Sequence, residues 1–127
     1  MTDELIARAR ARAEKAYAPY SRYRVGVVVV ADDGSTFEGV NVENSAYGST
    51  MCAEATAIGA AASAGVRKID TLAVSCIDDF EPGYPCGNCR QLMGEFGVER
   101  VLIDGPEGVI EHTFDEILPH GFRLKSD

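Results

Sequence analysis

The sequence predicts an α/β protein, a three-layer α/β/α sandwich around a mixed sheet of about five strands. Segments with helical character alternate along the chain with short apolar segments typical of strands, and this alternation favours a layered domain. The length of 127 residues suits one domain, which we expect to span residues 1–127. With 46% hydrophobic and 25% charged residues, the composition excludes a disordered chain or a coiled-coil rod.

The first half of the chain predicts two helices and a hairpin. A helix should run from residue 2 to about residue 17, because Pro19 disfavours its continuation. The apolar run at residues 25–31 predicts a strand buried on both faces, and residues 37–42 predict its hairpin partner. A helix over residues 52–64 contains seven alanines, so we expect it to pack closely against the sheet.

The second half predicts one further helix and the remaining strands. Residues 87–96 should form a helix that Pro85 introduces and Gly97 ends. Short apolar runs separated by turn residues predict strands over residues 71–77, 100–103 and 109–112, and a helical turn over residues 115–118.

Charge and hydropathy exclude several classes of partner. The formal net charge of −8 repels nucleic-acid backbones, so we expect no nucleic-acid partner. The longest apolar run, at residues 25–31, is far shorter than the ~20 residues of a membrane helix. The chain opens with acidic residues rather than a basic and apolar leader, and this predicts a cytoplasmic protein.

Three cysteines have the spacing of metal ligands. Cys86 and Cys89 are separated by two residues at the predicted start of a helix, and Cys52 opens another helix. Such a pair could also be a redox dithiol or half of a structural zinc site. A set of three ligands, however, leaves one coordination position open, as catalytic zinc sites do. The fourth, Cys76, is expected to be buried in a strand.

Acidic and polar residues accompany these cysteines. Glu54 follows Cys52 by two residues, so its carboxylate can exchange protons with a water beside the metal, unless it only complements the helix dipole. Asn41 and Glu43 are two residues apart at a strand end, so their side chains share one face. An amide and a carboxylate together suit vicinal hydroxyls, although a strand-end turn is an alternative. His112 and His120 are expected at the surface.

Nearly the whole chain resembles the small, homotetrameric cytidine deaminases. A cysteine followed by x-Glu and later by Pro-Cys-x-x-Cys is a zinc-deaminase signature. The segments that carry the resemblance are Ala18-Pro19-Tyr20-Ser21, Asn41-Val42-Glu43-Asn44, Tyr47-Gly48, Cys52-Ala53-Glu54, Pro85-Cys86-Gly87-Asn88-Cys89-Arg90-Gln91 and Leu118-Pro119. It implies hydrolytic deamination of cytidine and deoxycytidine to uridine and deoxyuridine plus ammonia, in pyrimidine salvage.

The resemblance also implies a role for each site residue. One Zn²⁺ per chain would be held by Cys52, Cys86 and Cys89, and Glu54 would shuttle protons. Ribose hydroxyls would bind Asn41 and Glu43, and backbone near Ala53 would hold the amino group. Tyr23 stands where the family usually has phenylalanine against the pyrimidine. A homotetramer with shared active sites is implied, in which Phe122 and Tyr47 complete a neighbouring subunit's pocket.

The chain departs from the family at Ala55, where an arginine usually follows the glutamate. Three thiolates and Zn²⁺ sum to a charge of −1, which such an arginine would offset. We expect Arg90, next to Cys89, and the helix N-termini to take over this role. Alternative functions are deamination of a related aminopyrimidine nucleoside such as blasticidin S, or a non-catalytic structural zinc or redox protein. A nucleic-acid-editing deaminase is disfavoured by the net charge.

Overall fold

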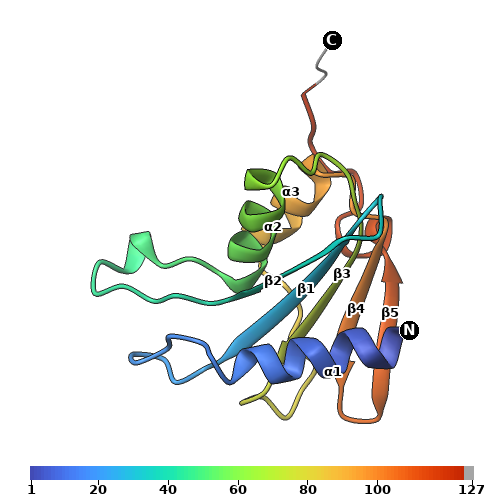
Figure 1. The fold of residues 1–127 in the computed structure, drawn as a ribbon. Coiled ribbons are helices and arrows are strands. Elements are labelled where there is room, and N and C mark those ends of the chain that lie inside the picture. The colour runs from blue at the N-terminus through green and yellow to red at the C-terminus, as the bar shows by residue number, and fades with distance from the viewer. Residues whose placement is uncertain (125–127) are drawn as a thin grey trace.

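A computed structural model describes residues 1–124, so the last three residues of the predicted domain lie outside the described part. Its elements are α1 (Thr2–Ala13), β1 (Val25–Ala31), β2 (Thr36–Val40), the 3₁₀ helix η1 (Tyr47–Ser49), α2 (Ala53–Ser63), β3 (Ile69–Cys76), α3 (Gly87–Glu95), β4 (Arg100–Gly105), β5 (Gly108–Thr113) and α4 (Phe114–Ile117). Helix α1 covers one face of the sheet, and α2 and α3 cover the other (Figure 1). The predicted three-layer sandwich is confirmed.

The five strands form one sheet in the order β2-β1-β3-β4-β5. Strands β3 and β4 are parallel, and the other neighbouring pairs are antiparallel, so the sheet is mixed as predicted. The parallel pair requires a crossover, which the segment containing α3 supplies. This crossover places the start of α3 beside the start of α2, on the same face of the sheet (Figure 1).

Alternate residues of β1 face opposite layers of the sandwich. Val25, Val27 and Val29 belong to the core under α2 and α3, whereas Val28 belongs to the core under α1. Gly26 lies on the α1 side, where an added Cβ would be 2.0 Å from the Ala9 carbonyl oxygen. The absence of a side chain at Gly26 therefore lets α1 lie directly on the strand.

Helix α2 approaches the sheet equally closely on the other face. A Cβ at Gly39 of β2 would lie 2.3 Å from Thr56 Oγ1 and 2.4 Å from the Ala57 nitrogen. The Thr56 hydroxyl donates a hydrogen bond to the Val40 carbonyl at 2.8 Å, which ties the helix to the end of β2. Ala53, Ala57 and Ala61 are buried. The expectation that the alanine-rich helix packs against the sheet is thereby confirmed.

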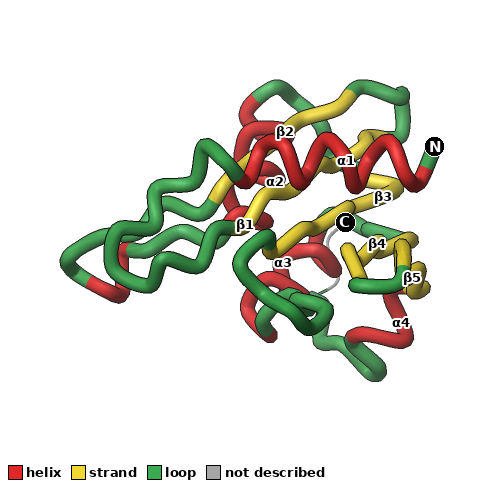
Figure 2. The backbone as a smooth tube through the Cα atoms, turned by 90° about the horizontal axis from the view of Figure 1, so that it is seen from below, coloured by secondary structure: helices red, strands yellow, loops and turns green. Residues whose placement is uncertain are grey.

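The first helix is shorter than predicted. It ends at Ala13, and the backbone then turns so that the Tyr17 N–H donates to the Asn41 carbonyl at 3.0 Å. Tyr17 forms a parallel bridge with Val42, so pairing with a distant segment overrides local helical preference. The segments around residues 17–22 and 42–50 extend together beyond the sheet (Figure 2).

None of the helices in residues 1–124 has the length and apolar character needed to span a bilayer.

The contact at Gly39 predicts a large effect of one methyl group. Gly39→Ala places a Cβ against backbone atoms of α2 that cannot move independently, so the free energy of unfolding should fall by about 1–3 kcal/mol. Urea denaturation measures the change. The matched control is Gly59→Ala, because Gly59 of α2 faces open space and alanine should stabilise a helix by up to about 1 kcal/mol. Equal stability of Gly39→Ala and the parent would contradict this packing.

Candidate functional site

Two cysteines occupy the N-cap positions of neighbouring helices. Cys52 precedes α2 and Cys86 precedes α3, both with extended backbone and neither capping its helix through its side chain. N-cap positions usually carry serine, threonine, aspartate or asparagine, whose oxygen accepts a backbone N–H. Cysteine at both N-caps leaves the two sulfurs free to point toward a common centre.

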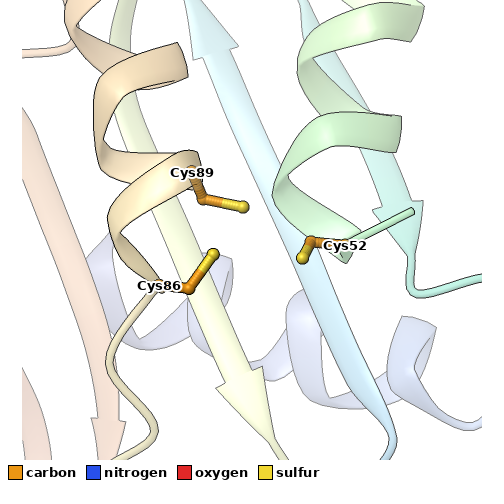
Figure 3. A group of neighbouring side chains, drawn as sticks. All are labelled: Cys52, Cys86 and Cys89. Atoms are coloured by element: carbon orange, nitrogen blue, oxygen red, sulfur yellow. The ribbon is translucent and has the colours of Figure 1, made fainter. Parts of the chain in front are cut away.

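The sulfurs of Cys52, Cys86 and Cys89 converge. All three Sγ atoms lie within 4.8 Å of one another, and their side chains point together from the first turns of α2 and α3 (Figure 3). Cys89 is buried, Cys52 is half-buried and Cys86 is exposed, so the cluster lies at the surface end of the core. Three close thiols form a donor set suited to zinc and leave a coordination position for a water or substrate.

The surroundings of the cluster favour a bound cation. Burial raises the pKa of the Cys89 and Cys52 thiols, whereas hydrogen bonds from the Cys89 backbone and from both neighbouring thiols lower the pKa of Cys86. A zinc ion supplies the charge that holds such sulfurs deprotonated. The positive ends of α2 and α3 point at the same place and add a smaller favourable field.

A cavity of about 390 Å³ opens beside the cysteines. Glu54, in the first turn of α2, lies in its wall and is only 5% exposed. Burial raises the pKa of this carboxyl above its ordinary value. The residues lining the cavity are Ser21, Tyr23, Val25, Asn41, Glu43, Thr50, Cys52, Ala53, Glu54, Cys76, Tyr84 and Cys86. A small polar molecule in this cavity would therefore meet both the sulfur cluster and the carboxyl group.

Asn41 and Glu43 line the cavity, and the fold fixes both side chains. The Asn41 amide accepts a hydrogen bond from the Val25 N–H at 2.9 Å and donates one to the Tyr23 carbonyl at 2.8 Å. The Glu43 carboxylate accepts the Tyr20 N–H at 2.9 Å and the Ser21 N–H at 3.1 Å, and also the Ser21 hydroxyl. The Ser21 hydroxyl and these N–H groups lower the pKa of Glu43.

The remaining residues predicted for the site divide into two groups. Tyr23 and Ala53 line the cavity with the residues above. Tyr47 and Phe122 do not; their side chains are 78% and 69% exposed. The ring of Tyr47 packs edge-on against Tyr20, at a centroid distance of 6.3 Å, in the segments that extend beyond the sheet.

Arg90 lies on α3 next to Cys89, but its guanidinium contacts backbone oxygens. Nε donates to the Pro85 carbonyl at 2.8 Å, and an Nη donates to the Ile117 carbonyl at 2.6 Å. Within residues 1–124, it makes no hydrogen bond to a cysteine sulfur. Arg90 thus ties the turn before Cys86 to the end of α4, and its role in offsetting thiolate charge stays a prediction.

Among the cavity residues that the sequence did not single out for the site, Cys76 and Tyr84 have polar groups that make further contacts. Cys76 lies at the end of β3 and is half-buried in the cavity wall, not enclosed in mid-strand as expected. Tyr84 precedes Pro85, and its hydroxyl forms a 2.7 Å hydrogen bond with His112 Nε2. His112, expected at the surface, is therefore partly buried against the cavity wall. The only feature of the sequence that could have indicated Tyr84 as a cavity residue is its position two residues before Cys86.

Comparison with known proteins assigns the family. Residues 1–104 match the model of a family described as the cytidine and deoxycytidylate deaminase zinc-binding region. The chain is also 44% identical over 123 residues to a cytidine deaminase of Sporosarcina psychrophila, covering 94% of this chain and 90% of that protein. The chain belongs to the cytidine deaminase family. The predicted resemblance is confirmed.

Solved structures agree with this assignment. The crystal structure of a cytidine deaminase from Burkholderia pseudomallei superimposes with a TM-score of 0.88 at 40% identity, covering 96% of this chain and 99% of that one. The blasticidin-S deaminase of Bacillus cereus is a more distant relative, 29% identical over 107 residues. The zinc-binding family and the three-cysteine cluster together fit one zinc per chain of this deaminase, as predicted.

The geometry predicts that zinc retention depends on the sulfur cluster alone. Cys86→Ala removes one of three sulfurs, so the zinc content should fall from one per chain to a small fraction of that value. Elemental mass spectrometry measures the zinc content. Cys76→Ala is the matched control, because Cys76 lines the same cavity outside the cluster and should keep its zinc. Full zinc content in Cys86→Ala, or a Cys86–Cys89 disulfide in zinc-replete, reduced protein, would contradict the site.

Proposed function

We propose that this deaminase hydrolyses cytidine and deoxycytidine to uridine and deoxyuridine plus ammonia, a reaction of pyrimidine salvage. The observation that carries this proposal is the position of Glu54, a buried carboxyl in the wall of the cavity that also contains sulfurs of the zinc-binding cluster. A purely structural zinc site has no need of a buried acid beside it. Membership of the family and the names of its relatives support the choice of cytidine over other substrates.

In this reaction an oxygen from water replaces the 4-amino group of the pyrimidine. Zinc held by Cys52, Cys86 and Cys89 supplies, when bound, a Lewis acid that lowers the pKa of that water. Glu54 takes a proton from the water as it attacks C4 and delivers it to N3. The same carboxylate then takes the second proton from the hydroxyl now on C4 and gives it to the amine, which departs as ammonia when the C4–N bond breaks and the C4 carbonyl forms. Burial raises the pKa of this carboxyl above its ordinary value, which suits a group that both takes and gives protons.

The cavity supplies the remaining contacts of a nucleoside. The Tyr23 ring would lie against the pyrimidine, and backbone at Ala53 would hold the amino group near C4. Asn41 retains one amide hydrogen and one lone pair beyond its two backbone contacts, and these would bind a ribose hydroxyl. Glu43, held by residues 20 and 21, would accept from a neighbouring hydroxyl.

We infer further that the enzyme is a homotetramer with shared active sites. Phe122 and Tyr47 are large side chains with most of their surface exposed, an arrangement typical of interfaces. Gln91 Nε2 donates to the Phe122 carbonyl at 2.8 Å, which holds the backbone of Phe122 against α3 while its ring faces outward. A ring so presented can enter the cavity of another subunit.

The mechanism predicts the effect of Glu54→Gln. Glutamine keeps the size and polarity of the side chain but cannot transfer the proton, so kcat for cytidine should fall by at least about 10²–10⁴-fold with zinc content unchanged. Loss of the cytidine ultraviolet absorbance measures the rate. Glu107→Gln, an exposed acid in the β4–β5 turn, is the control and should match the parent. Near-normal turnover in Glu54→Gln would exclude this mechanism.

Shared sites predict complementation between two defective chains. Glu54→Gln and Phe122→Ala should each lower activity strongly when assayed alone. After unfolding and refolding together, about a quarter of the sites should combine an intact Glu54 with a partner's intact Phe122, and activity should return in proportion. A mixture of Glu54→Gln with Glu54→Ala should regain none. A fully active monomer in size-exclusion chromatography would contradict the shared site.

A further inference from the structure

The loop over residues 77–85 contributes Tyr84 to the cavity wall and leads directly to Cys86. It contains no helix or strand, yet it places Tyr84 in the cavity wall and Cys86 at the start of α3. Inside the loop, Asp79 Oδ1 accepts the Glu81 N–H at 3.0 Å, which forms a local turn. Because regular hydrogen bonding is missing, side-chain contacts must hold this loop against the rest of the site.

One such contact comes from Tyr23, whose ring lies in the cavity wall. Its hydroxyl donates a 2.6 Å hydrogen bond to Asp79 Oδ2. Burial raises the pKa of Tyr23, and the hydrogen bond lowers the pKa of Asp79, so the pair keeps a neutral donor and a charged acceptor. Such charge-assisted bonds are stronger than neutral ones.

The same hydroxyl meets the loop at a second point. A Cβ added at Gly83 would lie 3.1 Å from the Tyr23 hydroxyl oxygen and 2.2 Å from Cys76 Sγ. The loop backbone therefore passes directly over Tyr23 and Cys76, with no side chain between them. Cys76 Sγ also donates to the Gly83 carbonyl at 3.7 Å, so the loop closes around the phenol.

A neighbouring contact fixes the outer side of the loop independently. Arg24 binds Asp78 through two side-chain hydrogen bonds of 2.9 and 2.8 Å and through its backbone N–H at 2.8 Å. Arg24 does not line the cavity, whereas Tyr23 does. The Tyr23–Asp79 bond is consequently the stronger of two contacts, with Cys76–Gly83, that connect the loop to residues lining the cavity.

We propose that Tyr23 acts through Asp79 as a positioning residue, whose hydroxyl fixes the loop over residues 77–85 as the wall that receives the pyrimidine ring. This inference takes its substrate from the proposed function, whereas the contact between Tyr23 and Asp79 does not depend on that function. The ring of Tyr23 and the loop that carries Tyr84 are then set in place before substrate binds. Loss of the tie weakens binding because the loop must be ordered at that moment, while the zinc cluster and Glu54, on α2 and α3, keep their chemistry.

The test compares Tyr23→Phe, Asp79→Ala and the double variant, all as zinc-loaded enzyme. Tyr23→Phe keeps the ring and removes only the hydroxyl. Each single variant should raise KM for cytidine by about three- to tenfold, with kcat within about twofold of the parent. The KM of the double variant should not exceed the higher KM of the two single variants. Without substrate, hydrogen exchange of peptides covering residues 77–85 should be faster in all three.

Two control variants separate this tie from general effects. Tyr17→Phe removes the hydroxyl of an exposed tyrosine outside the cavity, and Glu81→Ala removes a carboxylate from the same loop that has no hydrogen-bond partner in residues 1–124. Both should match the parent in exchange and in KM. Unchanged exchange in Tyr23→Phe, or KM increases that multiply in the double variant, would overturn the inference. A parent enzyme without activity on cytidine would instead contradict the proposed function. Hydrogen exchange of residues 77–85 would then be the measurement that tests whether Tyr23 holds the loop.

Discussion

The direct contact between α2 and β2 at Gly39 is the constraint on which the site depends. No side chain separates helix from strand there, and Thr56 locks the helix to the Val40 carbonyl. Because α2 is rigid over its length, this contact sets where its first turn lies, and with it the Cys52 sulfur and the Glu54 carboxyl. The β3–α3 crossover brings Cys86 and Cys89 to the same place from the neighbouring helix (Figure 3). The metal site is therefore the meeting point of two independently anchored helix starts.

A site without an arginine after Glu54 still has the positive ends of two helices directed at it. Ala55 leaves the first turn of α2 without a basic side chain, and Arg90 spends two hydrogen bonds on carbonyl oxygens. The N-termini of α2 and α3 remain directed at the three sulfurs. Each helix N-terminus is equivalent to about half a positive charge. The backbone thus supplies part of the positive field, while Arg90 stiffens the turn that carries Cys86.

The sequence predicted those features that depend on local pattern or on the spacing of reactive residues. The cysteine spacing identified the metal ligands as a group, and the alanine-rich segment identified the helix that packs on the sheet. Contacts between distant segments were not predictable in the same way. Pairing of Tyr17 with Val42 ends α1 early, and the bonds Tyr23–Asp79 and Tyr84–His112 join residues far apart in the chain. Only the folded sheet brings these partners together, so local sequence propensities do not predict their contacts.

The turn at residues 20 and 21 gives Glu43 an unusual environment for a carboxylate. Its negative charge is stabilised by two N–H groups and a hydroxyl, and no basic side chain among residues 1–124 pairs with it. The group is held ionised and can only accept hydrogen bonds. A sugar that enters with free hydroxyls brings the donors this position needs. A sugar bearing a phosphate near it would bring a second negative charge, which no basic side chain lining the cavity could neutralise. The cavity therefore presents a hydrogen-bond acceptor to a sugar hydroxyl and presents no basic side chain of its own lining to a phosphate.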